Sequence, residues 1–488
     1  MIIKKKFIKN YILKIENKNY VNDINLIFFN HLKKHKKTFF FVKLLIFIII
    51  NIDIIGQTIQ TIFINTDIEY LNDNFIKKEY NISKYRKKIK LGIYTYSLKG
   101  GGTERLTSLF INYLSQTKLF DIYLLTQKEK EENEFKIREN INRIIIKYGD
   151  IKIFINEIKK LKIEILIYQF PKGNEIEKLN NMKNIKIIFY ENSCFLYWIY
   201  SNYNAFKSIY YAYRKSKYVI SLIPFENDYL LKKWGINSVL MNNFVTYDYN
   251  QVIPSDLSSK TIIMIGRVND RMKRFELGVE SMKFIIREIP ESKMIIISNS
   301  FYNDYLVKLV NLLNLDNNVD FVEYTSTPEI YFKNASLHIF PSISESFGLV
   351  LSEIKIFGIP TILVGLDYVS ISKGGTIILY DDDSRSIAKE AIKILKDDKY
   401  RNKLGKEARK SMKKFNNELL VKKWVKLIIS IYNDDNYFEE LKNDNSMTES
   451  EANIIIKTQI QLLKKRNPNY HKITIDNIKN LSLMLNIF

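Results

Sequence analysis

Cysteine and histidine are scarce in this sequence of 488 residues, which has one cysteine and four histidines. The single cysteine, Cys194, excludes an internal disulfide and is typical of a protein from a reducing compartment. The histidines are too scattered along the sequence to predict a metal site. Disulfide-stapled scaffolds and histidine-rich metal proteins are therefore excluded.

A long uninterrupted apolar run is also lacking. A membrane-spanning helix needs roughly 20 apolar residues, and the best stretch, residues 38–55, is interrupted by Lys43, Asn51 and Asp53. A cleaved signal peptide is not expected, because this stretch begins far from Met1 and no small-residue cleavage site follows it. Basic residues precede the stretch and would attract anionic lipid. We expect an interfacial membrane segment, with a full span or a buried element as the alternatives.

Acidic residues are fewer than basic ones, 53 against 75, so the formal net charge is +22. Such a charge indicates attraction to anions such as nucleic acid, acidic lipid or a nucleotide sugar. The abundance of Ile, Asn and Lys indicates that a compositional bias supplies part of the lysines. Hydrophobic residues make up 46% of the chain, which excludes a disordered protein, and the length allows two or three domains.

The most informative stretch is residues 341–353, a polar turn between the apolar run 337–340 and a helical pattern that a Gly–Ile–Pro sequence stops. Free N–H groups at a helix N-terminus favour an anion such as phosphate, and Gly348 lets a ligand approach the backbone. Glu345 lies on the turn and Glu353 lies inside the helix. Their carboxylates suit the paired hydroxyls of a sugar or a ribose.

Two other strand-to-loop junctions carry candidate ligand contacts. The strand predicted at 261–265 is followed by Arg267 and Lys273, whose charges can neutralise a diphosphate beside a turn. The strand predicted at 89–95 is followed by a glycine-rich loop that contains Gly101 and Gly102 and then by a helical pattern. Further predicted strands alternate with helical stretches at 121–125, 163–168, 185–190, 218–222 and 294–298. This alternation predicts parallel sheets covered by helices, an α/β fold.

Glu345, seven intervening residues that include Phe347, Gly348 and Leu349, and then Glu353 resemble the donor-site signature of the family four retaining glycosyltransferases, or group 1, which have the GT-B fold. The resemblance implies that Glu345 contacts the donor sugar and Glu353 holds the nucleotide ribose. It also implies that the helix N-terminus between them faces the diphosphate. No metal or other cofactor is implied.

The same resemblance extends over residues 90–435. It implies that Arg267 and Lys273 stabilise the departing nucleoside diphosphate, and that Gly101 and Gly102 line the cleft near the donor phosphates. Where many family members carry a histidine facing the acceptor, this chain has Glu191 and Asn192. The catalytic residues on the acceptor side therefore stay open.

The resemblance implies two Rossmann-like domains that face each other across a cleft. We expect five segments, namely a basic N-terminal extension (1–88), an acceptor domain (89–246), a nucleotide-sugar domain (247–415), a helix that crosses back (416–435) and a C-terminal extension with a helical tail (436–488).

The triplet Asp381–Asp382–Asp383 permits two interpretations. Carboxylate oxygens are the ligands that hard divalent cations prefer, so the triplet could hold a metal. The triplet also stands between a predicted strand at 376–380 and a predicted helix at 387–395, where Asp caps a helix. We prefer the cap, because the basic pair Arg267 and Lys273 already supplies the charge that a metal would.

The sequence therefore predicts an enzyme that moves a sugar from a nucleotide sugar to a glycan or lipid-linked acceptor in surface polysaccharide or glycolipid synthesis. We expect it in the cytoplasm, peripheral on the inner face of the cell membrane, with an anionic membrane surface as a partner and no specific nucleic acid. One alternative is another GT-B enzyme, a phosphorylase or an epimerase. The other is a non-catalytic basic protein that binds membrane or nucleic acid and keeps a vestigial site.

Overall fold

The computed structural model describes residues 87–466, except for positions 133, 148, 197, 199–201, 231–233, 299–303, 326 and 443–446. The expected apolar segment at 38–55 lies outside the described residues, as does most of the basic N-terminal extension and the end of the C-terminal one. Within the described part, no helix has the length and apolar character needed to cross a membrane.

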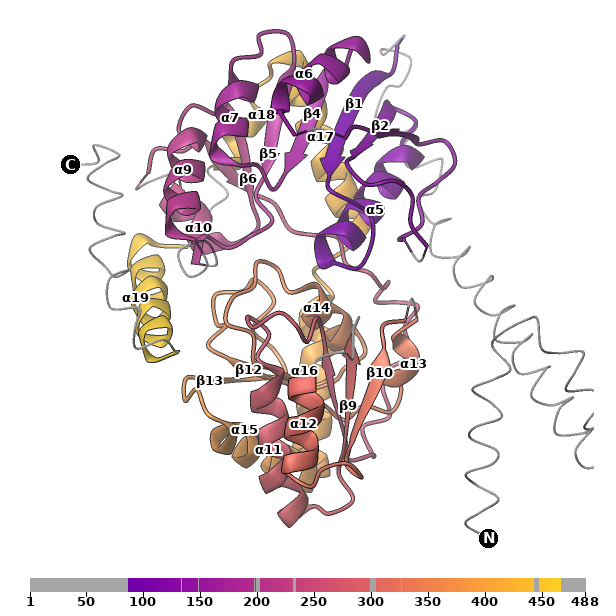
Figure 1. Ribbon diagram of the computed structural model, residues 1–488, viewed down its shortest axis with the longest axis vertical. Helices are drawn as coiled ribbons and strands as arrows, with labels where there is room; N and C mark the ends of the chain where they lie inside the picture. The colour runs from indigo at the N-terminus through magenta and orange to yellow at the C-terminus, as the bar shows by residue number, and fades with distance from the viewer. Residues whose placement is uncertain are drawn as a thin grey trace, which may run out of the picture. The chain divides into compact units, whose positions relative to one another are not determined.

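The first domain is built on a sheet of seven parallel strands in the order β3-β2-β1-β4-β5-β6-β7 (Figure 1). The strands are β1 (Ile89–Thr95), β2 (Phe120–Thr126), β3 (Asn142–Ile145), β4 (Ile165–Gln169), β5 (Lys186–Tyr190), β6 (Tyr218–Ser221) and β7 (Ser238–Leu240). The connecting helices are α5 (Gly102–Gln116), α6 (Ile151–Lys160), α7 (Gly173–Asn180), α9 (Tyr203–Tyr213) and α10 (Pro224–Asp228). Strand β4 is buried along its whole length, as expected for a parallel sheet with helices on both faces.

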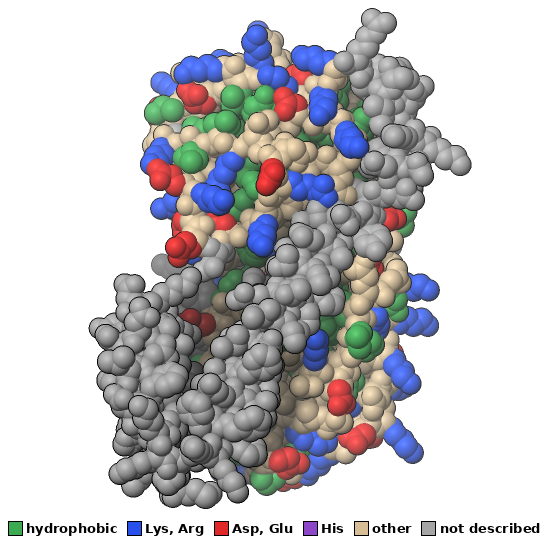
Figure 2. Space-filling model, turned by 90° about the vertical axis from the view of Figure 1, so that its right-hand side faces the viewer, with side chains coloured by type: hydrophobic (Ala, Val, Ile, Leu, Met, Phe, Trp, Pro, Cys, Tyr) green, Lys and Arg blue, Asp and Glu red, His purple; other side chains and the backbone are tan. Residues whose placement is uncertain are grey.

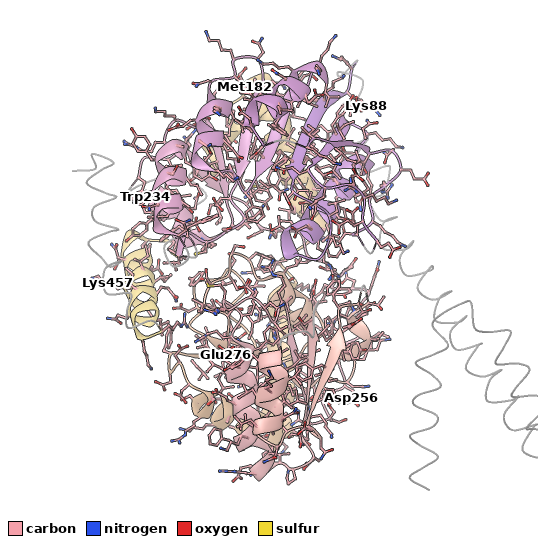
Figure 3. The ribbon with its side chains drawn as sticks, in the orientation of Figure 1. Lys88, Met182, Trp234, Asp256, Glu276 and Lys457 are labelled. Carbon is pink, nitrogen blue, oxygen red and sulfur yellow. The ribbon has the colours of Figure 1, made fainter. Side chains whose placement is uncertain are left out.

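The second domain has six parallel strands in the order β10-β9-β8-β11-β12-β13. They are β8 (Thr261–Ile265), β9 (Lys293–Ser298), β10 (Val319–Glu323), β11 (Leu337–Phe340), β12 (Thr361–Val364) and β13 (Thr376–Leu379). Its helices are α11 (Phe275–Glu288), α12 (Asp304–Leu312), α13 (Glu329–Phe332), α14 (Leu349–Ile356), α15 (Ser384–Lys396) and α16 (Asp398–Met412). Figure 3 shows side chains filling the space between helices and sheet in both domains.

The predicted α/β class with two parallel sheets is confirmed. Strands β3, β7, β10 and β12 were not among the strands that the sequence predicted. Strand β3 has four residues, begins with the polar Asn142 and Arg143, and is partly exposed, so its sequence does not show the pattern of a buried strand. Strand β12 directly follows the Gly–Ile–Pro sequence that ends α14, so no separate turn sets it apart from the end of that helix.

Helix α17 (Asn417–Asn433) returns to the first domain after the second is complete. The Trp424 ring lies 4.7 Å from the ring of Phe110 on α5, measured between centroids. At the other end of α17, the Lys186 ammonium at the start of β5 donates a hydrogen bond of 2.7 Å to the carbonyl of Ile431. These contacts attach α17 to the core of the first domain.

The C-terminal helices α18 (Tyr437–Lys442) and α19 (Glu449–Arg466) are also packed on the domains. Helix α19, which carries Lys457 in Figure 3, contacts both of them. The Tyr229 hydroxyl of the first domain donates a 2.5 Å hydrogen bond to Asn453, and the Gln459 amide donates one of 2.5 Å to the carbonyl of Gly365 in the second. The helical tail therefore links the two sheets.

Candidate functional site

In each sheet the strand order reverses at the centre. From β1 the chain adds strands on one side, and from β4 it adds them on the other; the same reversal occurs between β8 and β11. Ligands of parallel α/β sheets bind outside the carboxyl ends of the strands at such switch points. A cavity of about 390 Å³ lies there, lined by the loops that follow β1, β5, β8 and β11. It brings together seven of the nine residues singled out from the sequence, namely Gly101, Gly102, Arg267, Lys273, Glu345, Gly348 and Leu349.

Two helix N-termini open onto this cavity. Gly348 precedes α14 with a φ of +78°, a conformation that residues with a Cβ rarely adopt, and no side chain caps the helix. Gly101 precedes α5, again without a side-chain cap. The first N–H groups of both helices lack intrahelical partners, and both helix dipoles are positive at these ends. The cavity is therefore suited to an anion.

Basic and acidic side chains alternate across the cavity. Lys273 forms an ion pair with Glu345, and both side chains are largely buried. The Arg267 guanidinium lies 3.0 Å from a carboxylate oxygen of Asp270 and is 57% exposed, so it faces the open side. Burial raises the pKa of Glu104, on the first turn of α5, although its own backbone amide and Arg267 act against this shift. Each of the two basic side chains is thus paired with a carboxylate of the cavity lining.

Glu353 and Phe347 do not line the cavity. The Glu353 side chain is buried beneath it, 3.2 Å from the Arg105 guanidinium of α5, and accepts a hydrogen bond of 2.7 Å from the Thr246 hydroxyl. Burial raises the pKa of Glu353, while Arg105 and Thr246 act in the opposite direction. Phe347 is fully buried and packs edge-on against Phe415, with 5.6 Å between the ring centroids.

On the first-domain side, the cavity is lined by Asn192, whose amide donates a 2.8 Å hydrogen bond to Gln169. Its neighbour Glu191 is buried and accepts hydrogen bonds from the Tyr213 hydroxyl at 3.0 Å and from the Ser193 amide at 2.9 Å. Burial raises the pKa of Glu191 to about 7, and those two hydrogen bonds oppose the rise. Glu191 therefore exchanges its proton near neutral pH.

Sequence reasoning missed three residues of this region, Glu104, Arg105 and Asp270. Glu104 and Asp270 line the cavity, and Arg105 reaches Glu353 from the other domain. A signal existed for the first two residues, because Glu104 and Arg105 directly follow the glycine-rich loop that the sequence had marked. Nothing in the sequence alone pairs Arg105 with a carboxylate 248 positions away.

The aspartate triplet caps a helix, as expected. The Asp383 carboxylate accepts hydrogen bonds of 2.9 Å from the backbone amides of Arg385 and Ser386 at the start of α15. Asp382 forms ion pairs with Arg274, at 2.5 Å, and with Arg466 of α19, at 3.2 Å. Among the described residues, no group of three or more His, Cys, Asp or Glu side chains is arranged to hold a metal ion.

Solved structures share this architecture. Sucrose-phosphate synthase from Thermosynechococcus elongatus superimposes with a TM-score of 0.62 at 17% identity, over 71% of this chain and 100% of that one. Anabaena HepE in complex with UDP and glucose gives a TM-score of 0.57 at 13% identity, over 70% of this chain and all of that chain. The two sheets and their cavity thus have the GT-B fold.

The sequence comparisons define the family. The model of the family "Glycosyl transferases group 1" matches residues 248–411, which make up the second domain. Poly(glycerol-phosphate) alpha-glucosyltransferase of Bacillus subtilis is 24% identical over 369 residues, 73% of this chain and 49% of the relative. The N-acetylgalactosamine-N,N'-diacetylbacillosaminyl-diphospho-undecaprenol 4-alpha-N-acetylgalactosaminyltransferase of Campylobacter jejuni is 23% identical over 293 residues, 54% of this chain and 77% of the relative.

Residues 248–411 belong to the group 1 glycosyltransferase family, as the spacing of Glu345 and Glu353 had indicated. The chain spans about half of the length of the Bacillus subtilis relative.

Proposed function

We propose that this chain transfers a sugar from a nucleotide-sugar donor to a hydroxyl group of a glycan or lipid-linked acceptor, with retention of configuration. The observation that carries the proposal is the convergence of Arg267, Lys273 and Glu345 at the N-terminus of α14 in one cavity. Two relatives support the acceptor class by name, since one acts on poly(glycerol phosphate) and the other on a diphospho-undecaprenol glycan. Anabaena HepE, which shares the fold, binds UDP.

In this proposal the donor diphosphate lies against Arg267, Lys273 and the N–H groups at Gly348 and Leu349. The bond between the anomeric carbon and the phosphate oxygen breaks, and negative charge develops on the leaving nucleoside diphosphate. Fixed positive groups stabilise that charge without reorganising. The acceptor hydroxyl attacks on the same face, and its proton passes to the leaving phosphate.

The two glutamates have different parts in the proposal. Glu345 orients the donor sugar, because it lies in the cavity wall beside Lys273. Glu353 holds the ribose, which requires the buried carboxylate to turn from Thr246 and Arg105 toward the cavity when the donor binds. Gly101 and Gly102 keep the first-domain wall close to the phosphates, and Phe347 secures the turn from which α14 starts.

We also propose that the reaction needs no metal ion or other cofactor. Two basic side chains and two helix N-termini supply positive charge to the cavity. The carboxylates of Asp382 and Asp383 are engaged by arginines and by a helix terminus. The proposed place of action is the cytoplasmic face of the membrane, where the basic segment before residues 38–55 would meet anionic lipid.

The test is incubation of the protein with a panel of nucleotide sugars, recording the unfolding temperature and the release of nucleoside diphosphate. One donor should raise the unfolding temperature, and an added acceptor should accelerate release. Glu345→Gln should abolish transfer while the protein stays folded. A folded protein that responds to no donor in a broad panel would reject the proposal, and full activity of Glu345→Gln would reject the assigned site.

A further inference from the structure

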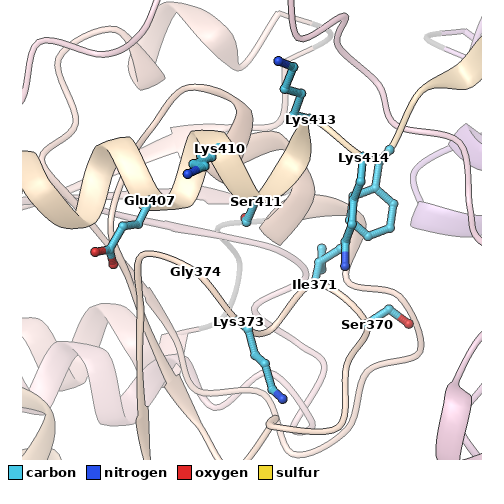
Figure 4. Close-up of a pocket in the computed structure, with 10 residues that line it drawn as sticks. Ser370, Ile371, Lys373, Gly374, Glu407, Lys410, Ser411, Lys413 and Lys414 are labelled. Atoms are coloured by element: carbon cyan, nitrogen blue, oxygen red, sulfur yellow. The ribbon is translucent and has the colours of Figure 1, made fainter. Parts of the chain in front are cut away.

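A second cavity, separate from the one at the strand ends, is surrounded by lysines. It has a volume of about 700 Å³ and lies in the second domain, between the loop that follows β12 and the end of α16 (Figure 4). Lys373 comes from the loop, and Lys410, Lys413 and Lys414 come from the end of α16 and the turn after it. The loop and the end of α16, about 40 positions apart in the sequence, thus both contribute positive charge to this cavity.

The protein neutralises these positive charges only in part: the Glu451 carboxylate, outside the lining, interacts electrostatically with Lys373. The lining holds four ammonium groups and the single carboxylate of Glu407, which leaves an excess of three positive charges. Within the described part of the chain, none of the four lysines forms a salt bridge. Other lysines are paired, for example Lys186 with Asp434 at 2.5 Å. Like charges repel, so gathering these lysines on one cavity wall costs free energy, and a bound anion would offset that cost.

The general basicity of the chain does not explain the cluster. On the coloured part of the face in Figure 2, Lys and Arg side chains are spread over both domains with acidic residues among them. The helix dipole favours lysines at the end of α16, which accounts for Lys410 and Lys413. It does not account for Lys373, which the tertiary structure brings in from a loop.

The wall of the cavity is held in place from beneath. Lys355 of α14 is fully buried, and its ammonium donates hydrogen bonds of 2.6 Å to the carbonyls of Ile371 and Lys373. Gly375 has a φ of +64°, and a Cβ there would lie 2.2 Å from the carbonyl oxygen of Leu404 on α16. The loop is therefore packed tightly against the helix, and the shape of the cavity is built in.

Lys355 also adds charge below the cavity. Burial, and to a smaller extent the nearby Lys414, lower its pKa to about 7. An anion above the loop would favour the charged form of this lysine and offset both effects.

We propose that this cavity binds a ligand with two or more closely spaced phosphate groups, at a site distinct from the donor cavity. Lysine ammonium groups act as point charges toward phosphate and need no planar partner. Three unbalanced charges within one cavity match a polyphosphate or a phosphodiester run better than a single carboxylate. The phosphates can belong to a soluble chain or to lipid head groups, which present the same chemistry.

The first experiment uses inorganic tripolyphosphate as the probe, at physiological salt, where loose surface attraction is screened. Lysine acetylation read by mass spectrometry reports each site separately. Tripolyphosphate should protect Lys373, Lys410, Lys413 and Lys414, and leave Lys152 and Lys159 of the first domain reactive, which are also exposed. Protection should persist in Arg267→Gln, because that residue lines the other cavity. Uniform protection of all lysines, or none, would overturn the proposal.

A matched pair of variants gives the second readout. Lys410→Gln/Lys413→Gln should weaken tripolyphosphate binding at least tenfold, whereas Lys152→Gln/Lys159→Gln, with the same change in charge, should leave it unaltered. An equal loss in both variants would show attraction to the whole basic surface and refute the site.

Vesicles distinguish the two sources of phosphate. If retention on phosphatidylglycerol vesicles, compared with phosphatidylcholine, falls in Lys410→Gln/Lys413→Gln and not in the control variant, the ligand is a lipid head group. If only tripolyphosphate binding falls, it is a soluble chain. If neither falls, the cavity is not a phosphate site.

Discussion

The guanidinium of Arg105 on α5 lies 3.2 Å from the carboxylate of Glu353 on α14, and this ion pair joins the two sheet domains. Glu353 also accepts a hydrogen bond from Thr246, in the segment that connects the domains. The Tyr247 ring lies 5.9 Å from the guanidinium carbon of Arg105. Both charges are therefore enclosed where the two domains meet, directly below the proposed donor cavity.

Removal of Arg105 should destabilise the protein strongly. Arg105→Met leaves the buried Glu353 without its counter-charge, which typically costs about 3–5 kcal/mol. The double variant Arg105→Met/Glu353→Gln should recover part of this loss, since no charge then stays buried. Urea unfolding of the single and double variants measures the coupling, and additive effects of the two substitutions would show that the pair does not interact.

Lys273→Met should lower the turnover number roughly a hundredfold, because one fixed positive group is lost from the leaving phosphate. Arg271→Met is the matched control, since this exposed arginine stands in the same loop but does not line the cavity. The turnover numbers of the two variants are measured at steady state with the nucleotide sugar that the panel identifies as the donor. Similar losses in both variants would indicate disruption of the loop rather than of charge stabilisation.

Glu191 should make stability depend on pH. Its pKa is raised to about 7 in the folded protein, mainly by burial, so between about pH 4.5 and 7 the folded state binds a proton that the unfolded chain releases. This contribution to the free energy of unfolding is complete below pH 4.5 and is lost as the pH rises through 7. The unfolding temperature of Glu191→Gln relative to the unchanged protein should therefore be higher at pH 7.5 than at pH 5. An equal difference at the two pH values would contradict the raised pKa.

Alanine substitutions at the three positions of the aspartate triplet should lower the stability of the protein by different amounts. Asp383→Ala removes the cap of α15 and should cost about 1 kcal/mol, whereas the exposed Asp381→Ala should change stability by less than about 0.5 kcal/mol. Asp382→Ala leaves Arg274 and Arg466 without their carboxylate and should be the most damaging of the three. Urea unfolding ranks the variants. If Asp381→Ala instead abolished transfer and a chelator did the same, a metal at the triplet would replace the cap interpretation.

Local sequence patterns were enough to locate most strands and the site loops. The alternation of apolar runs and helical patterns follows from burial at periods of two and 3.6 residues, and it identified β1, β4, β5, β8 and β11. Gly348 stands directly before the helix that the sequence predicted, and the structure shows that it adopts the left-handed conformation. Short edge strands such as β3 have too few buried residues to leave a pattern.

The sequence by itself determined the α/β class, the family, and the residues Arg267, Lys273 and Glu345 on loops after strands, because these depend on neighbours along the chain. Only the tertiary structure decided which charges meet. It pairs Lys273 with Glu345 across 72 positions and Glu353 with Arg105 across the domains, and it gathers four lysines around the second cavity. Such contacts depend on how the sheets and helices pack. The spacing of charged residues along the sequence does not predict that packing.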